Sequence, residues 1–391
     1  SKSGSYRLVS FRDIPPGIVK GARFISISAR EEDGQLCYFR QIKSEALPPV
    51  FELNPPRFNY VFAGETNPVR AQLNLVDTSD VKITFRIEDE NGREVHSRSF
   101  PSEEASRGVN LNEKLPAGKY FLAAIAEGPG GKTIDSGKKH LYRKLTASPV
   151  KTQIDRWSGM VVYKDKPLIP MIHSVSGSYR LMNTVPDFFS QIAVQGFNSL
   201  FVWSMDKGMG TPGDWDVDKA REVIRMSEKA GLPVIFYTPR DEKGRPVTDF
   251  SSDEIKEKVV SVVESLKDES GIMMWYHFDE IYSSWEKGEK PKNEQDLSEI
   301  YNACVDVDPY RPHYNNSWIS GRLYGGFGST DIIHCTSYTL ANVTRDGVPS
   351  TVGNSKRMRD TAELGGGVHP VGIWMQYYAR DRLRYPSVED I

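Results

Sequence analysis

The feature that most restricts the fold is a repeating order of short apolar runs and amphipathic helix patterns, which begins near residue 155. The runs that we interpret as strands are seven, at 167–174, 198–204, 232–238, 272–278, 311–318, 331–338 and 369–377. Helical patterns lie between them, as at 216–231, 251–268 and 293–307. Strands and helices that alternate at about 30–40 residues per unit predict parallel strands joined by crossover helices.

Two parallel folds compete for this pattern, a doubly wound sheet and a (β/α)8 barrel. No glycine-rich fingerprint follows any of the strands, as a dinucleotide-binding sheet would require. Polar and aromatic residues gather instead where the strands end, which is typical of the barrel, whose site is built from the loops after its strands. We therefore predict a (β/α)8 barrel over 148–391. Its eighth unit is missing from the pattern, so we expect the chain to be a fragment at its C-terminus, and the same can hold at its N-terminus.

The N-terminal third has a different period. Residues 51–147 contain short segments of alternating polarity, such as "VKITFRIED", separated by turn signals such as "DENGRE". This pattern predicts an antiparallel, Ig-like β-sandwich with a structural role. Residues 1–50 hold a few strand-like pieces, too few for a core of their own, and we interpret them as a remnant of a further module or as added edge strands.

Composition excludes several classes of function. The formal net charge is −2 over 391 residues, so no general basic field is available to hold nucleic acid. No run approaches the about 18 apolar residues of a membrane span, and no signal peptide is visible. The three cysteines, Cys37, Cys304 and Cys335, cannot form a disulfide framework, and we expect the last two to be buried thiols.

The side chains at the strand ends are the candidate functional residues. They comprise acids, amides, one His, one Arg and several aromatics: His173, Trp203, Asp206, Arg240, Asp241, Asp279, Glu280, Asn315, Asn316, Trp318, Tyr338, Trp374, Gln376 and Tyr377. Each has a structural alternative: His173 alone is more often a hydrogen-bonded structural residue, Trp203 and Trp374 can fill the barrel mouth, and Arg240 can simply pair with Asp241. Their joint occurrence at one rim favours a site.

Glycoside cleavage needs the groups that this rim supplies. A carboxylic acid protonates the leaving oxygen, and a second group stabilises or attacks the anomeric carbon. Aromatic faces and hydrogen-bonding side chains complete a sugar site. Metal catalysis is disfavoured by the absence of an HExxH motif and by the scattered His residues, and a Ser nucleophile by the absence of a GxSxG elbow. We predict no cofactor and no metal.

Three stretches resemble the (β/α)8-barrel glycoside hydrolases of the large retaining clan, in their multidomain bacterial form with an Ig-like sandwich before the barrel. "DRWSGMVVYKDKPLIPMIHS" is similar to the hairpin that enters the first strand, "GIMMWYHFDEI" to the fourth strand, and "VDPYRPHYNN" to the Asp–Pro–x–Arg–Pro passage into the fifth. The resemblance covers about residues 50–391. It implies that Glu280 is the general acid/base.

The sequence departs from that clan at two positions. Asp279 precedes Glu280 where the clan has Asn, and Gln376 stands where the clan has its nucleophilic Glu on strand seven. The Asp–Glu pair also resembles the hexosaminidases, in which the Asp orients the substrate's acetamido group and a later Tyr assists. That resemblance implies a role for Tyr338 or Tyr377.

Three functions remain open at this point. The first is hydrolysis of an oligo- or polysaccharide, with Glu280 as general acid/base and Asp279 as its partner. The second is carbohydrate binding or scaffolding on a degenerate barrel, which Gln376 favours. The third is a lyase or other sugar-active enzyme with His173 or Tyr338 as base. The first implies a carbohydrate partner and a secreted, periplasmic or cell-surface location.

Overall fold

The computed structural model describes part of the chain, in two compact units. One unit comprises 1–54, 68–111 and 120–141, and the other 55–67, 112–119 and 142–391. The described residues are 25–27, 30–32, 35–37, 42–44, 51–73, 80–128, 131–135, 138–203, 216–238, 253–278, 294–317, 330–337 and 371–375. No helix among them is long and apolar enough to cross a membrane.

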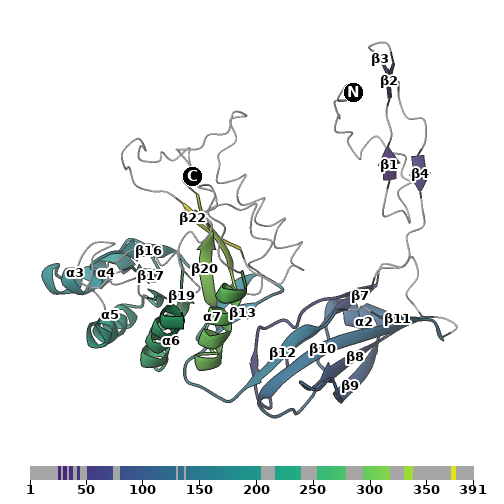
Figure 1. Ribbon diagram of the computed structural model, residues 1–391, viewed down its shortest axis with the longest axis horizontal. Coiled ribbons are helices and arrows are strands. Elements are labelled where there is room, and N and C mark those ends of the chain that lie inside the picture. The colour runs from purple at the N-terminus through teal and green to yellow at the C-terminus, as the bar shows by residue number, and fades with distance from the viewer. Residues whose placement is uncertain are drawn as a thin grey trace. The chain divides into compact units, whose positions relative to one another are not determined.

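The first unit is built from antiparallel strands (Figure 1). Near the N-terminus, β1 (Ile25–Ile27) pairs with β4 (Ile42–Ser44), and β2 (Arg30–Glu32) with β3 (Gln35–Cys37). β5 (Phe51–Leu53) pairs with β7 (Ala71–Leu73). β8 (Lys82–Glu88) pairs with β9 (Glu94–Pro101) and with β10 (Gly118–Glu127), which also carries β11 (Thr133–Asp135). A short helix, α2 (Ser102–Arg107), follows β9.

The β8–β9 hairpin confirms the turn predicted at "DENGRE". The Asp89 carboxylate accepts hydrogen bonds from the backbone N–H groups of Asn91 and Arg93, both at 2.9 Å. Gly92 has a φ of 78°, a conformation that a residue with a Cβ adopts at a cost. Alternate residues of β8, Ile83, Phe85 and Ile87, are buried, so one face of this pair is covered.

The second unit opens with small β elements. β6 (Val61–Phe62) pairs in parallel with β12 (His140–Leu145), where the buried Lys144 ammonium lies 2.8 Å from the Glu113 carboxylate. β13 (Thr152–Asp155), β14 (Met160–Tyr163) and β15 (Lys166–Leu168) form a three-stranded antiparallel sheet. Its tight turn uses positive φ at Lys164 (47°) and Asp165 (62°), as a type I′ hairpin requires.

A seven-stranded sheet dominates the second unit, and all its pairs are parallel. Its strands are β16 (Ile172–Val175), β17 (Ser199–Val202), β18 (Val234–Tyr237), β19 (Ile272–Tyr276), β20 (His313–Ser317), β21 (Ile333–Ser337) and β22 (Val371–Met375). They lie side by side in sequence order. This order confirms the seven predicted parallel strands, and it is the order of a singly wound barrel rather than of a doubly wound sheet.

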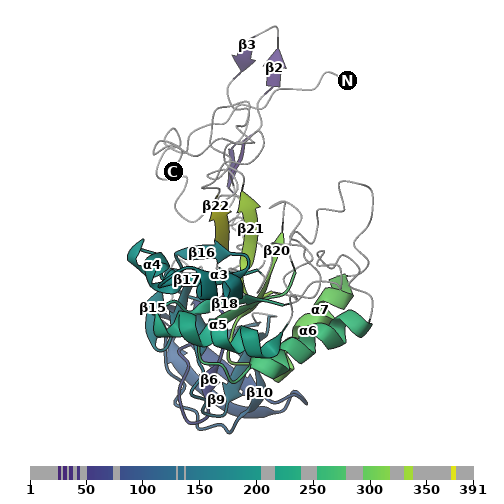
Figure 2. The same ribbon diagram turned by 90° about the vertical axis from the view of Figure 1, so that its left-hand side faces the viewer.

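Helices cover one face of this sheet (Figure 2). They are α3 (Ser178–Thr184), α4 (Phe188–Val194), α5 (Val217–Lys229), α6 (Asp253–Leu266) and α7 (Glu294–Val307). The Asp216 side chain caps α5 by accepting from the N–H groups of Asp218 and Lys219. Val223 and Ile224 of α5 and Val259, Val262 and Val263 of α6 are buried against the strands.

The entry to the sheet differs from the predicted first strand at 167–174. Residues up to Leu168 belong to β15, which pairs with β14, and the parallel strand starts only at Ile172. Pro170, which has no N–H to donate, lies between them. The Asn198 side chain holds the break, because it donates to the Ile169 carbonyl (3.0 Å) and accepts from the Met171 N–H (2.7 Å).

Candidate functional site

The seven-stranded sheet has two faces of different character, because alternate residues of a strand point to opposite sides. On the outer face, Leu200, Val202, Val234 and Phe236 pack with the helices. On the inner face, Phe201, Ile235, Tyr237, Tyr276 and Tyr314 form a second cluster with residues of the β13–β15 sheet.

The β13–β15 sheet packs against the end of the inner face at which the strands begin. Ile154 and Val161 are buried in the inner cluster, and the Tyr163 hydroxyl donates to the Ser270 carbonyl just before β19 (3.0 Å). This packing covers the N-terminal ends of the strands. In barrels of parallel strands the sites lie at the opposite, C-terminal ends of the strands.

An aromatic row crosses the inner face at that end. We use this name for Trp203, Tyr237, Tyr276 and Tyr314, which follow one another across β17 to β20. Tyr237 is the register partner of Tyr276, and Tyr276 of Tyr314. Ring centroids are 5.1 Å apart for Trp203–Tyr237, 5.1 Å for Tyr237–Tyr276 and 5.0 Å for Tyr276–Tyr314. The three tyrosines are buried and Trp203 is half-buried.

Polar groups continue the row on β20 and β21. The amide oxygen of Asn316 lies 3.1 Å from Nδ1 of His334, and the His334 ring lies 5.5 Å from that of Tyr314. Burial lowers the pKa of His334 to about 3, so this imidazole is neutral at ordinary pH. The inner face thus combines tilted and edge-to-face aromatic rings with hydrogen-bonding groups.

Four of the predicted site residues can be placed by their side chains, and one of them is Asn316, on the inner face beside His334. Trp203 belongs to the aromatic row, and its Nε1 donates to the Ser174 hydroxyl. His173 lies on the outer face, with its ring edge-on to Phe197 at 4.9 Å. Burial lowers the pKa of His173. Asn315 is buried and alternates with the inner residues Tyr314 and Asn316, which places it on the outer face with His313.

The other predicted site residues cannot be placed in this way. The backbone of Trp374 belongs to β22, opposite Thr336 of β21. Asp206, Arg240, Asp241, Asp279, Glu280, Trp318, Tyr338, Gln376 and Tyr377 lie outside the described residues. Their roles stay predictions.

The "VDPYRP" stretch forms a buried clamp on β19 at the outer face. Arg311 donates to the carbonyls of Lys267 (2.7 Å), Glu269 (2.6 Å) and Ile272 (2.8 Å), which lie at the end of α6 and the start of β19. Its guanidinium also pairs with the Asp308 carboxylate, and both side chains are at most 1% exposed. Asp308 in turn accepts a hydrogen bond from Nε1 of Trp275, at 2.7 Å.

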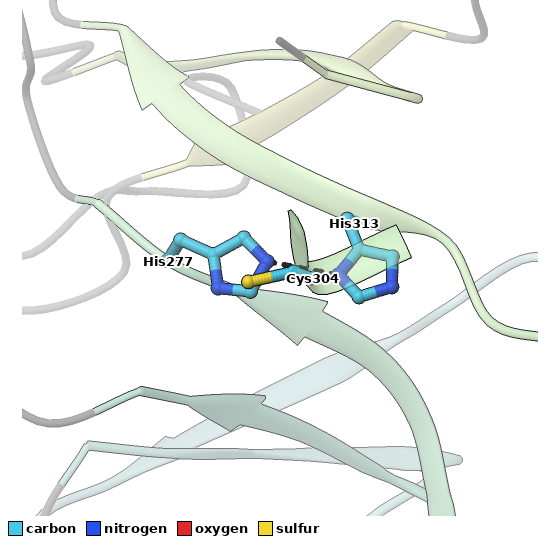
Figure 3. Close-up of side chains that lie close together, drawn as sticks. All are labelled: His277, Cys304 and His313. Atoms are coloured by element: carbon cyan, nitrogen blue, oxygen red, sulfur yellow. Dashed lines mark hydrogen bonds between the residues drawn. The ribbon is translucent and has the colours of Figure 1, made fainter. Parts of the chain in front are cut away.

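A pair of histidines extends this clamp to the end of β19. Nε2 of His277 lies 2.9 Å from Nδ1 of His313, and Nε2 of His313 lies 2.8 Å from the Asp308 carbonyl oxygen. Figure 3 shows the two rings and their hydrogen bond beside the Cys304 side chain. Burial is the main cause that lowers the pKa of both rings.

Among the described residues, His277, Cys304 and His313 are the group with ligand atoms close enough to hold a metal, all within 4.8 Å of one another. Their geometry fits a hydrogen bond better than a shared ion. The two ring nitrogens are 2.9 Å apart, whereas two nitrogens on a tetrahedral zinc are about 3.3 Å apart. Burial also raises the pKa of the Cys304 thiol to about 12.

Sequence reasoning missed most of these neighbours. Tyr237 and Tyr276 lie inside apolar runs, where nothing separates an inner residue from an outer one. His277 and His313 are 36 residues apart and show no motif spacing. The one available signal was the "VDPYRP" stretch, in which a charged pair stands between a predicted helix and a predicted strand.

Comparisons with known proteins give no family. No family model matches the sequence, and no curated protein matches it significantly. Among solved structures, a β-D-glucuronidase of Dictyoglomus thermophilum is similar with a TM-score of 0.39 and 13% identity. β-Glucuronidase 3 of Bacteroides uniformis is similar with a TM-score of 0.36 and 13% identity. A β-D-mannosidase of Dictyoglomus thermophilum is similar with a TM-score of 0.28 and 13% identity.

These alignments cover most of this chain but about half or less of the other proteins. Each alignment includes 82% of this chain. It includes 53% of the β-D-glucuronidase, 38% of β-glucuronidase 3 and 45% of the β-D-mannosidase. At TM-scores below 0.5 they carry no argument about the activity of this chain.

Proposed function

We propose that this protein is a glycoside hydrolase acting on an oligo- or polysaccharide, with Glu280 as general acid/base. One observation carries the proposal. β19, which ends at Tyr276, is the fourth of the sequentially ordered parallel strands, and the sequence continues through His277 and Phe278 directly into Asp279 and Glu280. An acid at the end of a barrel strand belongs to the functional edge of such a fold.

The aromatic row supports a sugar substrate. Trp203, Tyr237 and Tyr276 stand at or just after the ends of the second, third and fourth strands, on the face that leads to that edge. Rings suit the apolar faces of sugars, while Asn316 and His334 offer polar partners next to the row. We propose Arg240, Trp318, Trp374 and Tyr377, from the neighbouring strand ends, as further substrate contacts.

The second catalytic group is the open part of the proposal. Gln376 cannot act as a carboxylate nucleophile. Asp279 can instead orient a substrate acetamido group, with Tyr338 assisting, or Asp206 or Asp241 can activate a water for inversion. The separation from Glu280 decides between the mechanisms, because inverting carboxyls lie about 6.5–9.5 Å apart and retaining ones about 5–5.5 Å.

A screen of natural polysaccharides with reducing-end detection tests the proposal. The wild-type protein should release reducing ends from at least one glycan, and Glu280→Ala should release none while still binding it. A Gln376→Ala variant serves as the matched control at the neighbouring rim position. It should keep most of the chemistry and lose some affinity.

Gln376 also favours a second candidate, a carbohydrate-binding protein on a barrel that has lost catalysis. This reading predicts that the wild type binds a glycan without cleaving it, and that Glu280→Ala changes neither property. Binding without cleavage across the whole screen would replace the hydrolase proposal with this one.

A further inference from the structure

The outer face of β19 is held at three points by one turn of the chain, 308–311. Arg311 binds the Ile272 carbonyl at the start of the strand, and Asp308 binds the Trp275 indole near its end. His277, just after the strand, is bonded to His313, which is bonded to the Asp308 carbonyl. The sequence continues from this strand through His277 and Phe278 into Asp279 and Glu280.

The hydrogen bonds fix where the imidazole protons lie. A carbonyl oxygen can only accept, so Nε2 of His313 carries a proton and donates it to Asp308. In the neutral ring, Nδ1 of His313 must then accept, so Nε2 of His277 carries the second proton. Nδ1 of His277 remains as the acceptor that faces the Thr238 hydroxyl at 3.4 Å. Both rings are thus neutral Nε2–H tautomers. His277 donates to His313, and His313 donates to the Asp308 carbonyl.

Burial and the neighbouring charged groups keep both imidazoles neutral. His277 is 2% exposed and His313 is not exposed at all. Asp308 and Asp331 favour a charge on His313, but Arg311 and burial oppose it, and burial is the largest effect. Helix α7 contributes the Cys304 thiol and the Tyr301 hydroxyl, which donates to Asp331 (2.8 Å). Asp331 also accepts from the backbone N–H of His313 (2.8 Å), so the carboxylates of Asp331 and Asp308 are already hydrogen-bonded.

We propose that the His277–His313 pair positions the Asp279–Glu280 carboxyl pair by locking the main chain that leads to it. The proposal rests on the proposed function. The main chain of this segment is bonded on both sides, through Thr238 N–H to the Tyr276 carbonyl (2.9 Å) and Asn316 N–H to the Phe278 carbonyl (2.9 Å). The His277 ring adds the constraint that the segment cannot twist without breaking the donor chain to Asp308.

Paired variants distinguish a positioning role of His277 from a purely structural one. His277→Gln keeps an N–H donor near the place of Nε2, whereas His277→Leu fills similar space without it. His140→Gln is the matched control, because His140 is also a buried imidazole bonded to a backbone carbonyl, that of Leu53 at 2.9 Å, and it belongs to the first unit. A structural role alone would lower the unfolding midpoint of all three variants.

The test combines ring and carboxyl NMR on the full chain. Imidazole ¹⁵N shifts should show His277 and His313 as neutral Nε2–H tautomers from pH 8 to 5. The ¹³C titration of Asp279 and Glu280 should change by about one pKa unit in His277→Leu and return toward wild type in His277→Gln. On a cleaved glycoside, His277→Leu should lower kcat about tenfold or more with KM nearly unchanged.

Several results overturn the inference. They are an Nδ1–H tautomer or an ordinary titration near pH 6.5 in either ring, a stoichiometric metal in the purified protein that His277→Leu loses, or carboxyl titrations that superimpose in all variants. If the wild type cleaves no glycoside but the carboxyl titrations shift as expected, the proposed function fails and the positioning role stands.

Discussion

The two faces of the parallel sheet use polar groups in opposite ways. On the outer face, Asp308, Arg311, His277 and His313 are bonded to one another and to backbone carbonyls, and these bonds reach β19 at Ile272 and Trp275. On the inner face, the aromatic row places large rings side by side and leaves Trp203 half-buried. The comparison teaches that one face of the same sheet uses its polar groups to hold a strand, while the other places aromatic rings in contact across four strands.

The largest expected effect comes from breaking the outer clamp. Arg311→Met leaves the Asp308 carboxylate buried without its partner and deprives three carbonyls of their donor. We expect the free energy of unfolding to fall by about 3–5 kcal/mol, measured by denaturant titration. Arg225→Met is the matched control, because the Arg225 side chain is 66% exposed and its partner Glu269, which is 11% exposed, keeps Arg221 at 3.6 Å. An Arg311→Met midpoint equal to that of Arg225→Met would contradict the clamp.

Acid should lower the free energy of unfolding, because buried histidines lie on both faces of the sheet. His277, His313 and His334 have pKa values lowered by burial, that of His334 to about 3. Unfolded imidazoles bind protons below about pH 6.5 while the folded ones stay neutral, so stability is complete above that pH and is lost below it. The loss is up to about 1.4 kcal/mol per pH unit for each ring.

Denaturant titrations at pH 7.5 and 5.5 measure this loss. His277→Gln removes one of the three rings and should reduce the difference between the two pH values. Equal or greater stability at pH 5.5 would show that the rings titrate normally or gain a partner when charged.

The inner face is tested by removing its most exposed ring. Trp203→Ala should weaken binding of the cleaved glycan about tenfold, in line with aromatic stacking on nucleobases. Trp203→Phe keeps a ring and should retain most of the affinity. Calorimetry with the Glu280→Ala background avoids turnover. If Trp203→Ala binds like the parent, Trp203 is part of the core and not a platform.

The smallest effect is expected at His173. Its ring lies on the outer face against Phe197, and Nδ1 has no hydrogen-bond partner among the described residues. His173→Phe should therefore leave glycan binding and the pH dependence of cleavage unchanged, and should change stability by less than about 1 kcal/mol. A large loss of affinity would bring His173 back into the site as originally predicted.

The strands were predictable because buried parallel strands are nearly continuous apolar runs, such as Ile272–Tyr276. The break at Pro170 was readable in principle, yet the flanking apolar residues hid it. The face on which Asn315 or Asn316 lies was not predictable, because a shift of one residue in the strand exchanges the two faces.

The clamp was not predictable for a different reason. His277 and His313 meet only because β19 and β20 are neighbours in the sheet, a relation that no local pattern contains. The same holds for the aromatic row, which depends on the register of four strands. Sequence alone identified the strand that precedes Asp279 and Glu280, but not which residues hold that strand or lie beside it.

The most direct test of the central claim compares Glu280→Gln with the wild type on two substrates. A natural glycan needs protonation of its leaving group, whereas an activated aryl glycoside does not. We predict that Glu280→Gln loses kcat/KM on the natural glycan far more than on the aryl glycoside. Equal activity of the variant and the wild type on both substrates would show that Glu280 is not the acid and would contradict the account.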